Sequence, residues 1–311
     1  MTRQNSAMPT ITLGSRRSLL AQTQTRLIGQ LLQAAWPDLQ LNTQLLDTQG
    51  DLNRRDPLPT IGGKGLFTLE LENALRQGEI DLAVHSLKDL PIEDSPGLTI
   101  VAVPERATPH DMLISRHATR LEDLPEGAII GTSSLRRAAQ ILAIRPDMQI
   151  KDIRGNVDTR LRKLDDSAEG YTAIILAQAG LNRLGYHLDY ARPIPFEVML
   201  PAPGQGALGV QGRADDESIR AYMQSLDHAD TRAAVTAERA FLAGLGGGCA
   251  LPVAALATIN DSQVSLQALV AKPDGLRFIK VNGHAPITDA AMLGQSLAQE
   301  ALAHGARQLL A

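Results

Sequence analysis

Short apolar runs alternate along the chain with segments whose apolar residues recur at helical spacing. The runs "TITLG" (10–14), "IDLAVHS" (80–86), "AIIGTSS" (128–134) and "YTAIILAQAGL" (171–181) are typical of strands, the last two passing into helices. Leu20, Leu27 and Leu31 indicate a helix that stops before Pro37. Strands separated by helices favour parallel pairing with helices on both faces, so the pattern predicts an α/β protein.

Two segments rich in Pro or Gly, residues 101–112 and 199–210, are predicted crossings between domains. A chain that leaves one lobe at the first and returns at the second would form two α/β lobes around a cleft. Residues 255–281 indicate strands with a turn at "KPDG", and a terminal helix is expected near Thr288. We therefore expect domain 1 at 1–104 with 205–226, domain 2 at 105–204, and a smaller α+β domain 3 at 227–311.

Composition and charge narrow the class of protein. The 311 residues are 44% hydrophobic and 21% charged, as in an ordinary globular protein. The net charge of −4 and the 3% aromatic content argue against nucleic acid as a partner. A single cysteine fits a reducing compartment, and no apolar run suits a signal or a membrane span. We expect a soluble cytoplasmic protein with no membrane partner and no metal site.

Basic residues concentrate between Gly131 and Lys163. Ser133 or Ser134 in "GTSSLRR" is expected to cap a helix whose free N–H groups attract anions, with Arg136 and Arg137 beside that end. Guanidinium groups bind carboxylates in bidentate fashion, so the cluster suits a polycarboxylate ligand. A solvated basic helix face is the alternative for any single arginine.

The segment "AVHSLKDLP" (83–91) begins in a predicted buried strand and continues into a run of polar residues. The carboxyl ends of strands in open α/β sheets face the ligand crevice, so Asp89 is a candidate to move a proton or stabilise a cation. At about 4 Å and an effective dielectric near 20, that attraction is about 4 kcal/mol, about three powers of ten in rate. The alternative is an aspartate that caps its own turn beside Lys88.

Two glycine-rich segments remain. "GGKG" carries Lys64 but lacks P-loop spacing, so it indicates either a mobile loop over a cleft or a plain tight turn. "GGGC" places three glycines directly before Cys249. A lone cysteine is most often a small buried hydrophobe, but glycines let a backbone approach a ligand closely. Attachment of a group fits this thiol better than acyl transfer does.

Together the motifs closely resemble the hydroxymethylbilane synthase (porphobilinogen deaminase) family of tetrapyrrole biosynthesis. The resemblance covers nearly the whole chain from about Ile11 and rests on motifs that follow one another in the family's order: "LGSRRS", "GGKGLF", "AVHSLKDLP", "GTSSLRR", "RGNVDTRL", "LAQAGLNRLG", "LPAPGQGALG" and "GGGCALPV". It implies two type II periplasmic-binding-protein-like α/β lobes and a smaller α+β domain.

The resemblance also implies the reaction and its residues. Four porphobilinogen molecules would be joined head to tail, releasing ammonia, on a covalently attached dipyrromethane cofactor, and the product would pass to uroporphyrinogen-III synthase. Cys249 would hold the cofactor by a thioether, and Asp89 would stabilise the cationic azafulvene. The remaining implied cofactor contacts are Lys88, Thr132, Ser134, Arg136 and Arg137. The implied substrate contacts are Arg16, Ser18, Lys64, Arg154, Arg160, Arg183 and Gln205.

Three positions depart from the family's pattern, and two other classes of protein compete with it. Thr60 stands where some relatives carry lysine, Gly246 where a glutamate is frequent, and Asp158 adds an anion inside "RGNVDTR". A binding protein for a small anion would leave Cys249 and Asp89 unexplained. An RNA-binding protein is opposed by the acidic charge and scarce aromatics. We expect a monomeric transferase.

Overall fold

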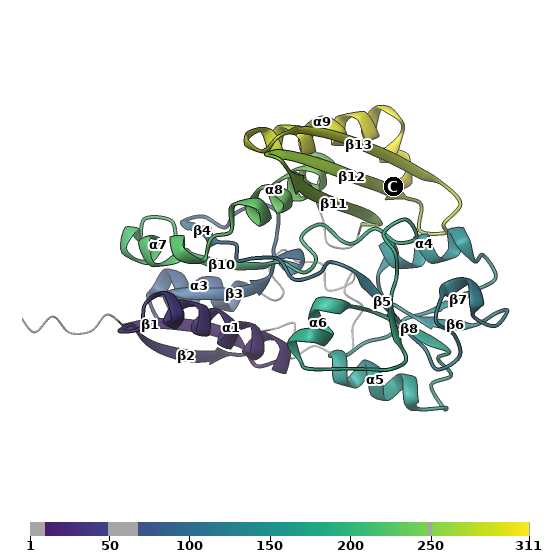
Figure 1. The fold of residues 1–311 in the computed structure, drawn as a ribbon, viewed down its shortest axis with the longest axis horizontal. Helices are drawn as coiled ribbons and strands as arrows, with labels where there is room; N and C mark the ends of the chain where they lie inside the picture. The colour runs from purple at the N-terminus through teal and green to yellow at the C-terminus, as the bar shows by residue number, and fades with distance from the viewer. Residues whose placement is uncertain (1–9, 49–67, 248–250, 311) are drawn as a thin grey trace, which may run out of the picture. The chain divides into compact units, whose positions relative to one another are not determined.

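The computed structural model describes residues 10–48, 68–247 and 251–310, and divides into two compact units (Figure 1). In these ranges the first unit holds residues 10–48, 68–105 and 208–228, and the second holds 106–207, 229–247 and 251–310. The second unit contains two separate sheets. The division into three domains with the boundaries given above stays a prediction.

The first unit is a five-stranded sheet in the order β2-β1-β3-β10-β4. Its strands are β1 (Thr10–Arg16), β2 (Gln40–Leu46), β3 (Leu82–Ser86), β4 (Leu98–Ala102) and β10 (Leu208–Arg213). Its helices are α1 (Leu19–Ala35), α3 (Leu69–Gln77), α7 (Glu217–Met223) and the 3-10 turns η1 (Leu87–Asp89) and η3 (Gln224–Leu226).

Both faces of this sheet are covered, which explains why its central strand β3 begins with consecutive apolar residues. Along β3, Leu82 and Val84 pack in one cluster with residues of α1 and α7, whereas Ala83 packs with residues of α3. Alternate residues of a strand point to opposite faces, so both sets are removed from water. Helix α1 ends at Ala35, before Pro37 as predicted.

The second sheet has the order β7-β6-β8-β5-β9. Its strands are β5 (Asp111–Ile114), β6 (Ile129–Gly131), β7 (Gln149–Lys151), β8 (Ala173–Ala177) and β9 (Ala191–Pro193). The helices beside it are α4 (Leu135–Ile144), α5 (Val157–Asp165), α6 (Gln178–Arg183) and the 3-10 turn η2 (Leu121–Asp123). Residues of α4 pack in the cluster on one face, and residues of α5 and α6 in the cluster on the other.

Each of these sheets contains one strand that runs against its neighbours, which the expectation of parallel pairing missed. Strand β10 pairs antiparallel with both β3 and β4, and β5 pairs antiparallel with both β8 and β9. These two strands follow the two predicted crossings. Each enters its sheet directly from a crossing and not through a helical crossover, so the parallel rule does not apply to it.

The third sheet is the antiparallel meander β11-β12-β13. It consists of β11 (Val253–Asn260), β12 (Gln263–Ala271) and β13 (Phe278–Pro286), with α8 (Ala229–Gly244), α9 (Ala290–Ala303), α10 (Ala306–Leu310) and the 3-10 turn η4 (Ile287–Asp289). Helices α8 and α9 pack against it. The predicted "KPDG" turn joins β12 to β13, and α9 begins close to the predicted Thr288. The predicted fold class of two α/β lobes and a smaller α+β domain is confirmed.

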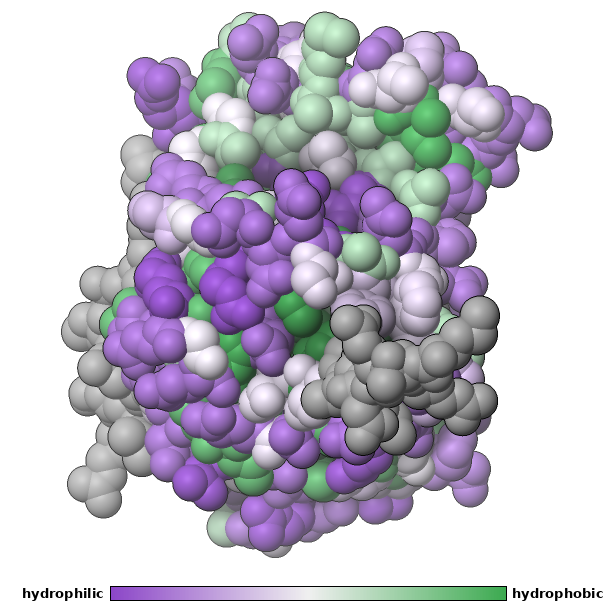
Figure 2. All heavy atoms as spheres, turned by 90° about the vertical axis from the view of Figure 1, so that its left-hand side faces the viewer, coloured by the Kyte–Doolittle hydropathy of each residue, from purple (hydrophilic) through white to green (hydrophobic). Residues whose placement is uncertain are grey.

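One face of the molecule is mostly hydrophilic (Figure 2). Figure 2 shows hydrophilic side chains over most of one face, with hydrophobic ones gathered in small areas between them. None of the helices described is long and apolar enough to cross a membrane.

Candidate functional site

The carboxyl ends of β1 and β3 carry the polar motifs of the first unit. The two strands are parallel neighbours, so their ends meet at the same edge of the sheet. Arg16 is the last residue of β1, and Lys88 and Asp89 lie in η1 directly after β3. Ser18 begins α1, where its hydroxyl accepts a hydrogen bond of 3.3 Å from the amide of Ala21. The fold therefore brings together the "GSRRS" and "SLKDLP" motifs.

The Asp89 carboxylate is exposed and makes no hydrogen bond or ion pair with any residue of the described ranges. No side chain caps η1, so the alternative in which Asp89 caps its own turn is wrong. An aspartate on a buried strand end usually has a local partner, because short polar side chains bond to nearby backbone. This carboxylate is therefore available to a ligand.

In the second unit, the motif "GTSSLRR" follows β6 and begins α4. Ser134 is the N-cap, and its hydroxyl accepts a 3.4 Å bond from the amide of Arg137. The Thr132 hydroxyl in turn accepts a 3.2 Å bond from the amide of Ser134. The predicted cap is confirmed at Ser134, while Ser133 donates from its hydroxyl to the carbonyl of Ile153. Both cap hydroxyls remain donors for a ligand.

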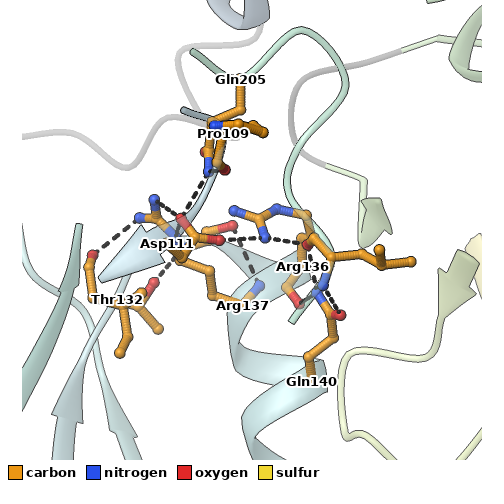
Figure 3. A network of polar contacts seen from close by, with 10 residues as sticks. Pro109, Asp111, Thr132, Arg136, Arg137, Gln140 and Gln205 are labelled. Carbon is orange, nitrogen blue, oxygen red and sulfur yellow. Dashed lines mark hydrogen bonds and ion pairs between the residues drawn. The ribbon is translucent and has the colours of Figure 1, made fainter. Parts of the chain in front are cut away.

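The two arginines of this motif share one buried carboxylate, that of Asp111 at the start of β5 (Figure 3). Arg136 Nη1 lies 2.7 Å from Asp111 Oδ2 and also donates to the carbonyl of Leu200. Arg137 donates from Nε and Nη2 to Asp111 Oδ1, and from Nη1 to the carbonyl of Ile175. Asp111 is fully buried and the arginines are 4% and 6% exposed. The pair is thus a fixed, preoriented element and not a solvated helix face.

The charges of this cluster shift the proton equilibria of its members. Burial by itself would raise the pKa of Asp111, but the neighbouring Arg136 and Arg137 guanidiniums outweigh it and hold that pKa well below its usual range. Burial lowers the pKa of Arg136, which nevertheless stays charged. With one carboxylate between two guanidiniums, the cluster keeps one net positive charge for an anionic ligand.

Gln205 and Arg183 connect the second crossing to this cluster. Gln205 Nε2 donates to the carbonyl of Pro109 at 2.7 Å and to Asp111 Oδ1 at 3.0 Å. Arg183, at the end of α6, donates from Nη2 to the carbonyl of Gly206 at 2.7 Å. Burial lowers the pKa of Arg183 to about 10. In this structure both side chains therefore hold the crossing backbone in place.

The motif "RGNVDTR" (154–160) begins in the loop after β7 and continues into the first residues of α5. Arg154 Nε is 3.5 Å from Asp152 Oδ2, and Arg160 Nε donates to the carbonyl of Gly155 at 2.8 Å. The anion that departs from the family's pattern, Asp158, pairs with Arg162 at 3.6 Å on the exposed surface of the helix. Its charge is thus partly balanced within α5.

Some predicted residues lie outside the described residues: Cys249, Lys64 and Thr60. The segment before Cys249 is described as far as Gly247. Gly246 and Gly247 have φ values of 98° and 69°, a left-handed backbone that glycine adopts without strain. The run of glycines after α8 is therefore required by backbone conformation at these two positions.

Sequence reasoning missed two buried acids that organise the second unit. Asp111 was read as part of a crossing, although an aspartate opening an otherwise apolar strand is a signal of a buried counter-ion. Glu238 of α8 is fully buried, binds Arg106 through both oxygens, and accepts from the amides of Gly204 and Ala257. In the sequence it stands inside a helix with no feature that marks it.

Among the solved structures that the fold resembles are the methionine-binding protein MetQ and the OxyR2 regulatory domain from Vibrio vulnificus. MetQ is 13% identical with a TM-score of 0.43, covering 70% of this chain and 89% of MetQ. The OxyR2 domain is 17% identical with a TM-score of 0.41, covering 73% and 97%.

Sequence comparisons cover nearly the whole chain. Residues 11–221 match the family model described as "Porphobilinogen deaminase, dipyromethane cofactor binding domain", and residues 232–303 match "Porphobilinogen deaminase, C-terminal domain". A porphobilinogen deaminase of Roseiflexus sp. (strain RS-1) is 47% identical over 97% of this chain and 99% of its own. That of Desulforudis audaxviator (strain MP104C) is 48% identical over 97% of both chains. The chain belongs to the porphobilinogen deaminase family.

Proposed function

We propose that this chain is a hydroxymethylbilane synthase that joins four porphobilinogen molecules head to tail on a covalently held dipyrromethane, and releases ammonia at each addition. The observation that carries the proposal is the exposed, unpartnered carboxylate of Asp89 at the end of β3. The family match supplies the reaction, and Asp89 supplies a group able to perform its central step.

Asp89 acts on the charge that develops when ammonia leaves the aminomethyl group of porphobilinogen. The carbon–nitrogen bond breaks with its electron pair going to nitrogen, which leaves a cation delocalised over the substrate pyrrole. A carboxylate at about 4 Å lowers the energy of that cation by about 4 kcal/mol at an effective dielectric near 20. Coupling forms a carbon–carbon bond and releases one ring proton, and Asp89 assists this transfer. Lys88 lies beside it in η1.

The arginines bind the acidic side arms of the pyrroles. Arg136 fits this role because its Nε and Nη2 make no hydrogen bond within the described part of the chain, while Nη1 fixes the group on Asp111. The other proposed cofactor contacts are Lys88, Thr132, Ser134 and Arg137. Arg16, Ser18, Arg154, Arg160, Arg183, Gln205 and Lys64 are the proposed substrate contacts. The bound dipyrromethane supplies the nucleophilic pyrrole carbon on which the chain grows, and Cys249 supplies its sulfur attachment.

The same proposal extends to the setting of the enzyme. We infer a cytoplasmic monomer that passes its linear product to a uroporphyrinogen-III synthase. The single cysteine and the bacterial relatives support a reducing compartment. Elution at the mass of two chains in size-exclusion chromatography with light scattering would overturn the monomer.

Substitution of Asp89 tests the proposal. Asp89→Asn keeps the shape of the side chain but removes its charge, so we expect an unchanged cofactor content and a turnover reduced about a thousandfold. The matched control is Asp38→Asn, which removes a second exposed, unpartnered carboxylate of the first unit and should leave turnover unchanged. Turnover of Asp89→Asn within threefold of the parent would refute the carboxylate's role.

A further inference from the structure

A cavity of about 540 Å³ lies in the second unit between α4 and the C-terminal sheet. Small-molecule sites commonly have volumes of about 300–1,000 Å³, so its size suits a ligand of a few rings. None of the described residues assigned above to substrate or cofactor lines it. It therefore requires its own explanation.

A close backbone contact and a buried apolar cluster lie beside the cavity. Gly275, in the turn between β12 and β13, has φ 74°, and a Cβ placed on it would lie 2.7 Å from the carbonyl oxygen of Ala139 in α4. Beside this contact, Ala139 and Leu200 pack with Leu269 of β12 in one buried cluster. The hairpin therefore rests directly on α4, and the cavity opens next to this contact.

One wall is a polar face of the sheet. Ser265 and Gln267 of β12 stand opposite His284 and Asn282 of β13, and Lys280 follows on the same face. None of these five side chains forms a hydrogen bond or ion pair with another residue in the parts of the chain described. The wall thus presents a row of uncommitted donors, among them the ammonium of Lys280.

The opposite wall is apolar and carries the one acidic residue of the lining. Phe196 and Ile144 lie on this side, and Phe278 lies at the edge of the sheet. Glu197 is the acid, and its negative charge is balanced by the positive charge of Lys280. Half-buried aromatic rings opposite polar donors match a ligand with an apolar ring system and an acidic group.

We propose that this cavity binds an aromatic or heteroaromatic organic anion, with its ring system against Phe196 and Phe278 and its carboxylate or sulfonate at Lys280. Asn282, Gln267 and His284 supply further donors beside the acid group. Burial of the ring system provides the affinity, and Lys280 is the charged donor that pairs with the acid group.

The lining connects this site to the Asp111 cluster. Gln140 donates from Nε2 to the carbonyls of Arg136 and Leu200, and the Leu200 carbonyl also accepts from Arg136. On the same side, the ring of Phe196 stacks on the ring of His110, with centroids 3.9 Å apart. His110 directly precedes Asp111 in the chain. A ligand in this cavity should therefore alter the catalytic constants for porphobilinogen. This effect on catalysis rests on the proposed function, whereas binding of the ligand does not.

The probe is 8-anilinonaphthalene-1-sulfonate, a fluorescent aromatic anion, titrated into the cofactor-loaded protein. We expect one saturable site per chain. Ser265→Trp fills the cavity and Lys280→Glu reverses its charge, and each should weaken binding at least tenfold. Arg307→Glu makes the same charge reversal at an exposed residue of α10 outside the lining and should leave binding unchanged. Circular dichroism confirms that each variant is folded.

Equal binding by the parent and both cavity variants, or no saturable site, would overturn the proposal. Competition separates this cavity from the substrate site: porphobilinogen added to Asp89→Asn should not displace the probe, and full displacement would assign it to the substrate site. For the coupling, saturating probe should change kcat/KM in the parent and not in Ser265→Trp. An unchanged kcat/KM in the parent would overturn only the coupling between this cavity and the substrate site. Failure of the proposed function would be seen separately, as undiminished turnover in Asp89→Asn.

Discussion

At the scale of single residues, a buried carboxylate decides how the arginines of "GTSSLRR" are used. The sequence pattern predicted an anion-binding cluster and a cap; the cap is confirmed at Ser134, and the anion binding stays a prediction. It did not predict that Arg136 and Arg137 converge on Asp111, because the partner lies in β5, far along the chain. Local patterns identify candidate groups, but long-range pairs depend on which strands become neighbours.

Asp111→Asn should destabilise the protein strongly. Removing one partner of a buried ion pair leaves uncompensated charge, which costs about 3–5 kcal/mol. The matched control is Asp165→Asn, which breaks the exposed, solvent-screened pair with Arg116 and should change stability little. Urea unfolding monitored by circular dichroism measures both. Equal losses in the two variants would contradict the role given to Asp111.

His85 gives a pH dependence at the same scale. It is buried in β3, where burial lowers its pKa to about 4, while Gln211 and Glu72 raise it and Arg16 lowers it. Because its pKa is lower in the folded state than in the unfolded one, His85 contributes stability above about pH 6.5 and this is lost as pH falls towards 4. We expect a loss of roughly 3 kcal/mol across that range, at about 1.4 kcal/mol per pKa unit.

The variant His85→Gln tests this assignment, because an uncharged amide does not titrate. Unfolding free energies measured from pH 7.5 to 4.5 should fall less steeply in His85→Gln than in the parent. The control His117→Gln, at an exposed histidine, should follow the parent. Parallel curves for His85→Gln and the parent would show that this histidine is not the titrating group.

At the scale of elements, the strands and helices with clear periodicity were predictable and the pairing at the crossings was not. The runs that became β3, β6 and β8 are largely apolar because both faces of their sheets are covered. Strand β10 begins within a segment read as a crossing, since Pro and Gly dominate its approach. Its antiparallel direction follows from the path of the whole chain and leaves no local signal.

Gly275→Ala tests the close contact between the hairpin turn and α4. A side chain there must adopt a positive φ and also displace the backbone of α4. The control Gly97→Ala has a similar φ of 77° with no atom within 4 Å of the added carbon, so it costs only the conformational part, about 1 kcal/mol. Thermal unfolding should show a clearly larger loss for Gly275→Ala. Equal losses would mean that the contact yields easily.

At the scale of the whole molecule, the protein is acidic, and several of its arginines lie at specific positions in the fold. With a net charge of −4 it does not attract polyanions generally, yet guanidiniums stand at the strand ends of both units. The family match explains these positions, because each added pyrrole brings two carboxylates that the protein must bind. The assignment of particular arginines stays a prediction.

The attachment of the cofactor at Cys249 is the claim on which the proposed function depends most, and intact mass tests it most directly. Protein purified from cells that make porphobilinogen should be heavier than its sequence by one dipyrromethane, and Cys249→Ser should have the bare mass of its chain. Added mass that persists in Cys249→Ser, or a parent with no added mass, would contradict the account.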